Sequence, residues 1–171
     1  TVFFLGRHEE RKGLDVLLEA LPALPPDIRV WIGSDGPDTE RLKLRHAGDP
    51  RPEGLGRLSD LEKRRRLAAA RIFCAPSIHG ESFGVVLLEA MAAGAAIVAS
   101  NLSGYSLVAR ADRDALLVDP RDVTALAAGL NRVLDDPELH GALVASGRRR
   151  AEEFSMDHLA ERYVDLYDRV T

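Results

Sequence analysis

The chain has 171 residues, the length of one globular domain. A composition of 46% apolar and 29% charged residues is that of a folded protein and excludes a disordered or fibrous chain. The 27 acidic residues outnumber the 23 basic ones, and the net charge of −4 gives no reason to expect nucleic acid or an anionic membrane as the main partner.

Short apolar runs alternate with segments of helical periodicity along the chain. This alternation predicts βαβ units: an α/β, Rossmann-like, mostly parallel sheet with helices on both faces. The expected strands are Val2–Leu5, Ile28–Ile32, Ile72–Ala75, Ala96–Ala99 and Leu116–Val118. A further strand is favoured by position at 52–58, although its proline and glycines are poor strand formers.

Two amphipathic helices are expected where leucines and small apolar residues recur with helical spacing, from Leu14 to Leu21 and from Val123 to Leu130. A break at 135–137 precedes another helix that runs to about Glu153, and Ser155 can cap a last one. The last helix carries an apolar stripe from Leu159 to Val170, which needs a surface to pack against.

The single cysteine, Cys74, lies in an apolar run and is expected in the core, so no intrachain disulfide is possible. No apolar run reaches the roughly 18 to 20 residues that span a bilayer. Because the chain opens on a strand without an initiator methionine, we expect it to be a fragment of a longer protein.

The segment Gly80–Gly84 follows a predicted strand and leads into a helix, so it lies at the carboxyl edge of the sheet, where ligands bind in open α/β folds. Free amides at the start of that helix, at Gly84, Val85 and Val86, suit a phosphate, and the glycine allows close approach. Glu89 interrupts the apolar helix and needs donors, either sugar hydroxyls or an arginine.

Glu81 and Glu89 are eight residues apart, which is about 12 Å along a helix. The carboxylate pairs of glycosidases lie about 5 to 9.5 Å apart, so these two are expected to hold opposite ends of an elongated ligand instead. Arg7 and Lys12 follow the first strand at the same edge and could neutralise a diphosphate, although a charged loop can also be merely solvated.

Other common sites are not supported by the pattern. The chain has no phosphate-binding loop of the G-x-x-x-x-G-K-[ST] type, and Gly54–Ser59 only half matches a dinucleotide fingerprint. The five histidines lack metal spacing, and His8 and His79 are interpreted as loop residues. Gly33, in a turn at the same sheet edge, either allows close ligand approach or belongs to a plain turn.

With these two loops, Gly6–Gly13 and Gly80–Gly94, the chain resembles the C-terminal, donor-binding domain of retaining GT-B glycosyltransferases of the group 1 kind, and among them the bacterial phosphatidylinositol mannosyltransferases. The resemblance covers essentially the whole chain, and 80–94 looks like the E-x7-E signature of that family. It implies that Arg7, Lys12 and Glu81 are the catalytic residues. The implied donor-binding residues are Gly6, Arg7, Lys12, Gly33, Leu58, Asp60, Lys63, Glu81, Ser82, Phe83, Gly84, Val85, Val86 and Glu89.

In that arrangement the cations grip the diphosphate, Glu81 holds the hexose and Glu89 the ribose, while Leu58, Asp60 and Lys63 surround the guanine. The resemblance implies GDP-mannose as the sugar donor, a phosphatidylinositol-like or other glycan or lipid acceptor, and no metal or separate cofactor. The alternatives are a UDP- or ADP-sugar transferase and a non-catalytic nucleotide-sugar binding module.

Residues 1–153 are expected to form the donor-binding domain, and 154–171 a helix that packs on an N-terminal acceptor domain or forms a dimer contact. Because the chain lacks that acceptor domain, it is not expected to turn over alone. The expected location is the cytoplasm. Contact with the inner face of the plasma membrane is expected only through the other half of the full enzyme.

Overall fold

The computed structural model describes residues 1–155 and has one six-stranded parallel sheet in the order β3-β2-β1-β4-β5-β6. The strands are β1 (Val2–Leu5), β2 (Val30–Gly33), β3 (Pro52–Gly56), β4 (Ile72–Ala75), β5 (Ala96–Ser100) and β6 (Leu116–Val118). The predicted Rossmann-like α/β class is therefore confirmed. The strand order reverses between β1 and β4. Open α/β sheets bind ligands at such a switch point, in the crevice outside the carboxyl ends of the strands.

The structure adds most to the sequence prediction at β2 and β3, which are neighbours at one edge of the sheet. The weakly favoured strand at 52–58 exists as β3, and its proline is tolerated because it begins an edge strand. β2 starts two residues later than predicted. The amide of Ile28 donates to the carbonyl of Pro25 and closes a turn, so the ladder starts only at Val30, whose amide donates to Arg51.

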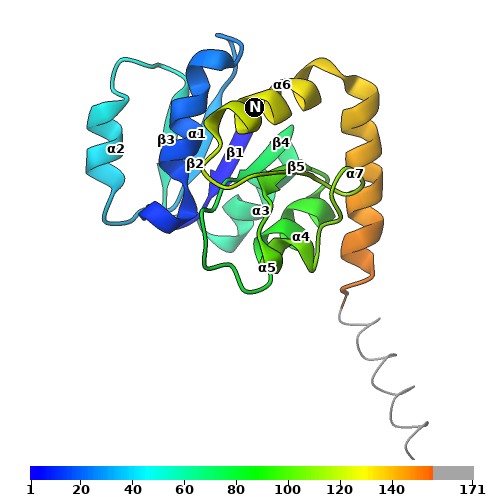
Figure 1. The fold of residues 1–171 in the computed structure, drawn as a ribbon. Coiled ribbons are helices and arrows are strands. Elements are labelled where there is room, and N and C mark those ends of the chain that lie inside the picture. Colours follow the sequence, from blue (N-terminus) through cyan, green and yellow to red (C-terminus); the bar gives the residue numbers. More distant parts are fainter. Residues whose placement is uncertain (156–171) are drawn as a thin grey trace, which may run out of the picture.

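Seven helices cover the two faces of the sheet within residues 1–155. They are α1 (Leu14–Ala20), α2 (Thr39–Arg45), α3 (Asp60–Ala69), α4 (Val85–Ala93), α5 (Ser103–Ser106), α6 (Val123–Asp135) and α7 (Pro137–Glu152). Figure 1 shows α1 and α6 on one face and α3, α4 and α5 on the other. Each face has its own apolar core, because alternate residues of a strand point to opposite faces.

β1 shows this alternation directly. Val2 and Phe4 pack with α1 and α6, whereas Phe3 packs with α3 and α4. Cys74 is fully buried, as predicted, and burial raises the pKa of its thiol.

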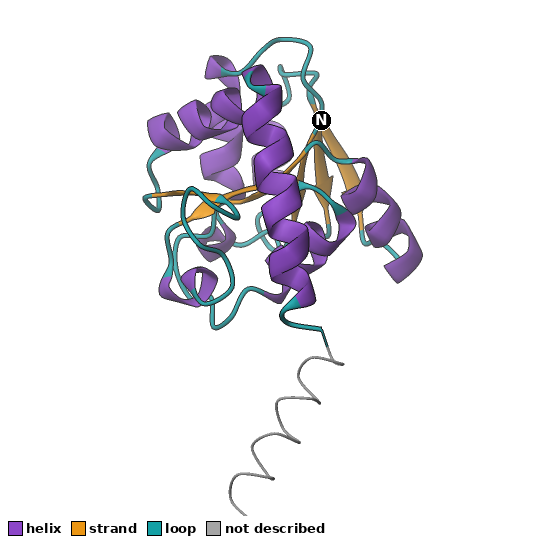
Figure 2. Ribbon diagram, turned by 90° about the vertical axis from the view of Figure 1, so that its right-hand side faces the viewer, coloured by secondary structure: helices purple, strands orange, loops and turns teal. Residues whose placement is uncertain are grey.

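The predicted break before α7 is confirmed. Asp136 caps the helix by accepting hydrogen bonds from the amides of Glu138 and Leu139, at 3.0 and 2.9 Å, and Pro137 takes the first helical position. Figure 2 is turned so that this long helix faces the viewer. The predicted last helix and its stripe from Leu159 to Val170 lie outside the described residues. No helix in residues 1–155 is long and apolar enough to cross a bilayer.

Candidate functional site

The loops that follow β1 and β4 lie against each other at the carboxyl edge of the sheet. Lys12 Nζ donates a hydrogen bond to Glu81 Oε1 at 2.5 Å, across 69 positions of sequence. The amide of Ile78 donates to the carbonyl of Arg11 at 2.7 Å, and Arg11 Nη1 lies 3.4 Å from the carbonyl of Gly80. The structure therefore brings together the two loops that the sequence marked separately.

A glycine makes this close approach possible. Gly13 has a left-handed φ of 67°, and a Cβ at this position would lie 1.9 Å from the carbonyl oxygen of Pro76 in the loop after β4. Only glycine has neither the steric restriction on φ nor the clashing atom. The contact between the loops is therefore built into their backbones as well as into the Lys12–Glu81 pair.

Glu81 is the most protected charged side chain of this contact, with 11% of its side chain exposed, against 20% for Lys12 and 39% for Arg11. Its Oε1 atom accepts hydrogen bonds from Lys12 and, at 2.9 Å, from the hydroxyl of Ser77. A charge-assisted hydrogen bond and a second donor offset the cost of removing this carboxylate from water.

The start of α4 offers amide groups to an anion. Gly84 precedes the helix with a φ of 91°, and the amides of Val85 and Val86 have no acceptor among the described residues. Such amides, with the positive end of the helix dipole, form a ready site for a phosphate. Phe83 and Val85 are exposed beside them. Gly84 also has a packing role, since a Cβ there would lie 2.9 Å from the ring of Tyr105.

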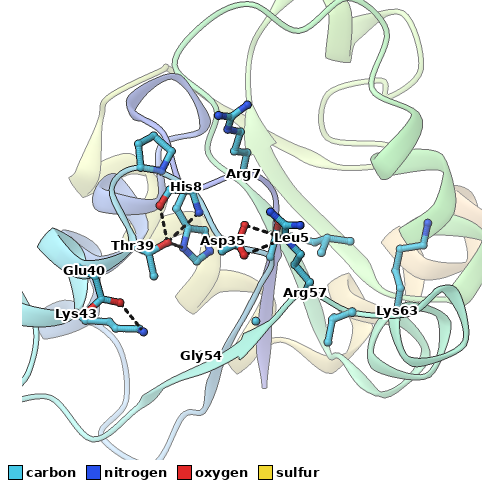
Figure 3. A pocket seen from close by; sticks show the side chains of 15 residues that line it. Leu5, Arg7, His8, Asp35, Thr39, Glu40, Lys43, Gly54, Arg57 and Lys63 are labelled. Carbon is cyan, nitrogen blue, oxygen red and sulfur yellow. Dashed lines mark hydrogen bonds and ion pairs between the residues drawn. The ribbon is translucent and has the colours of Figure 1, made fainter.

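A cleft of about 1190 Å³ adjoins these loops and is lined by residues from the ends of β1, β2 and β3. Figure 3 shows Arg7, Lys63 and the Glu40–Lys43 pair on different sides of it, around Leu5 and the ion pair between Asp35 and Arg57. The Arg7 side chain is 67% exposed, with Glu9 3.7 Å away, so it can turn toward an anion. Of the predicted site residues, Arg7, Leu58 and Lys63 line this cleft.

Glu89 lies on the other side of Lys63. Its Oε1 accepts a hydrogen bond from Lys63 Nζ at 2.7 Å, and its side chain is 38% exposed. The sequence left two kinds of partner open for Glu89, sugar hydroxyls or an arginine. In the free chain Glu89 forms an ion pair, and its partner is a lysine of α3 instead of an arginine. Asp60, Lys63 and Glu89 line a second groove of about 600 Å³ between α3 and α4, which shares Lys63 with the cleft.

Comparison with known proteins decides the family. The family model described as glycosyl transferases group 1 matches residues 1–136. The chain belongs to this family. The resemblance that the two loops predicted is confirmed.

This group 1 glycosyltransferase domain is 39% identical, over its whole length, to a phosphatidyl-myo-inositol mannosyltransferase of Mycolicibacterium smegmatis, of which it covers 45%. It is 35% identical, over 99% of its length, to a D-inositol 3-phosphate glycosyltransferase of Xylanimonas cellulosilytica, of which it covers 42%. The chain thus spans less than half the length of these curated relatives.

Among solved structures, the domain superimposes on Alr3699/HepE of Anabaena, a complex with UDP, with a TM-score of 0.87. The superposition covers 98% of this chain and 48% of the other, at 21% sequence identity. At this level of identity the likeness shows a shared fold. It agrees with the strand order and its reversal between β1 and β4.

Sequence reasoning missed several residues around the site of this glycosyltransferase domain. His8 is a loop residue, as interpreted from the sequence. What the sequence did not indicate is that its side chain is buried and that Nδ1 lies 2.8 Å from Thr39 Oγ1, which ties the loop after β1 to the loop after β2. Burial lowers the pKa of His8. Ser77 and Tyr105, which lie behind Glu81, were missed as well. No spacing marked these residues, because the pairs of His8 with Thr39 and of Ser77 with Tyr105 join residues 31 and 28 positions apart.

No group of three or more His, Cys, Asp or Glu side chains in residues 1–155 is arranged to hold a metal ion. Metal-independent transfer stays a prediction for this glycosyltransferase domain.

Proposed function

We propose that this domain binds a nucleotide-diphosphate sugar and is the donor half of a retaining glycosyltransferase, with GDP-mannose as the donor and a phosphatidylinositol-like or other glycan or lipid acceptor. The observation that carries the proposal is the contact of Lys12 with Glu81, which joins a cation and a carboxylate at the crevice. The identity to a phosphatidyl-myo-inositol mannosyltransferase supports mannose and the acceptor class.

The diphosphate would lie between Arg7, Lys12 and the free amides at the start of α4. Arginine offers a planar fork to phosphate oxygens and lysine a compact charge, so the two together stabilise the negative charge that grows on the leaving diphosphate. These cations and the helix start give the transferase a way to act without a metal or other cofactor. The departing diphosphate would then assist attack by the acceptor on the same face of the sugar.

The rest of the sugar donor would extend on both sides of the diphosphate. Glu81, next to Lys12, would accept hydrogen bonds from the hexose, and the cleft beside Leu58 and Lys63 would take the nucleoside. Glu89, on the far side of Lys63, would contact the ribose, in place of or together with its present ion pair. The acceptor would be bound by the other half of the full protein, which would also make any contact with the membrane.

A UDP-sugar is the second candidate donor, because the Anabaena protein of the same fold was solved with UDP. Thermal unfolding with GDP-mannose, GDP, UDP-glucose and ADP-glucose separates the candidates, since a ligand that binds only the folded state stabilises it. At a hundred times its dissociation constant, the true ligand should stabilise by about 2.7 kcal/mol, or roughly 5 to 10 °C for a domain of this size.

Arg7→Gln should weaken binding of the preferred nucleotide sugar by about tenfold, the typical worth of one charge-assisted contact. Arg45→Gln is the matched control, since Arg45 lies on α2 and pairs with Glu19 at 2.7 Å. If no nucleotide sugar raises the unfolding temperature, the proposal is wrong. If binding occurs but mixing with a separately expressed acceptor half gives no transfer, the domain is a non-catalytic binding module.

A further inference from the structure

We propose that Ser77 and Tyr105 are positioning residues that hold Glu81 ready for the hexose, and so set the affinity for the sugar part of the donor separately from its nucleotide part. The inference rests on the proposed function, because it assigns Glu81 to the hexose. It goes further in naming two buried hydroxyls that lie behind Glu81.

The direction of the hydrogen bonds follows from the number of protons available. Glu81 as a carboxylate can only accept hydrogen bonds. The Ser77 hydroxyl therefore donates its one proton to Glu81 Oε1, at 2.9 Å. Tyr105 Oη lies 3.0 Å from Ser77 Oγ and must therefore be the donor in that contact. The result is a one-way relay from the Tyr105 hydroxyl through the Ser77 hydroxyl to Glu81.

Tyr105 is suited to remain a donor at all ordinary pH values. Its side chain is 1% exposed, and burial, the largest cause, raises the pKa of its hydroxyl above its usual range. Ser77 is 2% exposed. Neither hydroxyl can reach a ligand in the crevice, so any effect on binding must pass through Glu81.

The relay uses only one of the two oxygens of Glu81. Oε1 receives both Lys12 and Ser77, whereas Oε2 has no hydrogen-bond partner among the described residues and is not sealed from solvent. A carboxylate held in this way cannot rotate without breaking two hydrogen bonds. Oε2 is thus left as a fixed acceptor, and a sugar hydroxyl is the matching donor at this place.

The backbone supports the same arrangement. α5, which carries Tyr105, packs directly under the loop, and a Cβ on its Gly104 would lie 2.0 Å from the carbonyl oxygen of Glu81. The Tyr105 ring also contacts the loop, as its 2.9 Å approach to a Cβ built on Gly84 shows. The hydroxyl can therefore be removed as Tyr105→Phe while the ring stays in place.

The test compares the dissociation constants of GDP and GDP-mannose for the full chain, measured by calorimetry. Tyr105→Phe should weaken GDP-mannose by about two- to tenfold, the range for loss of one hydrogen bond, and should leave GDP within twofold. Ser77→Ala should do the same or more. In the Ser77→Ala background, Tyr105→Phe should change the ratio less than it does in the wild-type chain, because the path through Ser77 is already broken.

Ser106→Ala is the matched control, since it removes a hydroxyl of α5 that bonds Asn101 and the carbonyl of Leu102 instead of the loop. Circular dichroism checks that each variant folds. If Tyr105→Phe does not fold, the comparison is made with Ser77→Ala alone. An unchanged ratio, or an equal loss for GDP and GDP-mannose, overturns the positioning role. If the wild-type chain binds UDP and UDP-glucose instead, that pair is used; if it binds no nucleotide, the proposed function itself is wrong.

Discussion

Replacing Gly13 by alanine tests the physical basis of the site, the contact between the two loops. The new Cβ would lie 1.9 Å from the Pro76 carbonyl oxygen. Ordinary nonbonded contacts begin at about 3.5 Å, so the loops would have to separate by roughly 1.5 Å. Such a shift would strain or break the Lys12–Glu81 and Ile78–Arg11 hydrogen bonds. A left-handed φ in alanine adds about 1 to 2 kcal/mol.

Together these effects should lower the free energy of unfolding by about 3 to 5 kcal/mol, a large share of the 5 to 15 kcal/mol of an ordinary domain. Two other glycines separate the contributions. Gly56 has a φ of 63° with nothing within 4 Å of a built Cβ, so Gly56→Ala should cost only the conformational part, about 1 to 2 kcal/mol. Gly141 lies exposed in α7, and Gly141→Ala should stabilise by up to about 1 kcal/mol.

Urea unfolding is the assay, followed by the fluorescence of Trp31, the one tryptophan of the chain. Trp31 lies on β2 under the guanidinium of Arg66, so its emission should change when the sheet unfolds. The reasoning is refuted if Gly13→Ala falls within about 1 kcal/mol of Gly56→Ala. That result would mean that the two loops do not touch in solution.

Three further predictions concern charged and titrating groups. Lys12→Met and Glu81→Gln should each lower the free energy of unfolding by about 1 to 3 kcal/mol. A double-mutant cycle measured by urea unfolding should give a coupling energy of about 1 to 2 kcal/mol between the two side chains. If the two losses of stability are simply additive, the side chains do not interact. Lys63→Met should cost under about 1 kcal/mol by the same assay, since the Lys63–Glu89 pair is more exposed, and a larger loss would be unexpected. Burial lowers the pKa of His8 in the folded chain below the ordinary value of 6.5. As the pH falls below 6.5, His8 is therefore protonated in the unfolded chain before it is protonated in the folded chain. The free energy of unfolding should decline from pH 6.5 down to the lower pKa of the folded chain. When the free energy of unfolding is measured from pH 7.5 to 5, His8→Asn should make this decline shallower. If the slope is unchanged, the decline is due to His46, whose pKa burial also lowers.

The sequence predicted the buried strands better than the charged helices, for a physical reason. A parallel strand covered on both faces must be apolar at every position, so the inner strands β1 and β4 have the predicted bounds. α2 and α3 each bury a single side chain, Leu42 and Leu67, so neither has the apolar stripe that would have predicted its bounds.

The position of the site was predictable because the carboxyl ends of neighbouring parallel strands must share an edge. The hydrogen-bond partners of the individual side chains at the site were not predictable. The hydrogen bonds of His8 with Thr39 and of Ser77 with Tyr105 join residues 31 and 28 positions apart, and the pairing of Lys63 with Glu89 depends on how α3 packs against α4. No periodicity within one element reports such contacts. They follow from the tertiary arrangement.

Under the proposed function, the Lys12–Glu81 pair would let one edge of the sheet bind both an anion and a polyhydroxy ligand. The ammonium group of Lys12 has three hydrogens and Glu81 takes one, so two remain for phosphate oxygens. Glu81 in turn would keep Oε2 for a sugar hydroxyl, since both of its hydrogen bonds go to Oε1. If the two loops did not touch, these side chains would each have to be ordered when the ligand binds, at about 0.5 to 1.5 kcal/mol apiece. By holding each other they are ordered beforehand, so two motifs that lie 69 positions apart act as one preorganised unit.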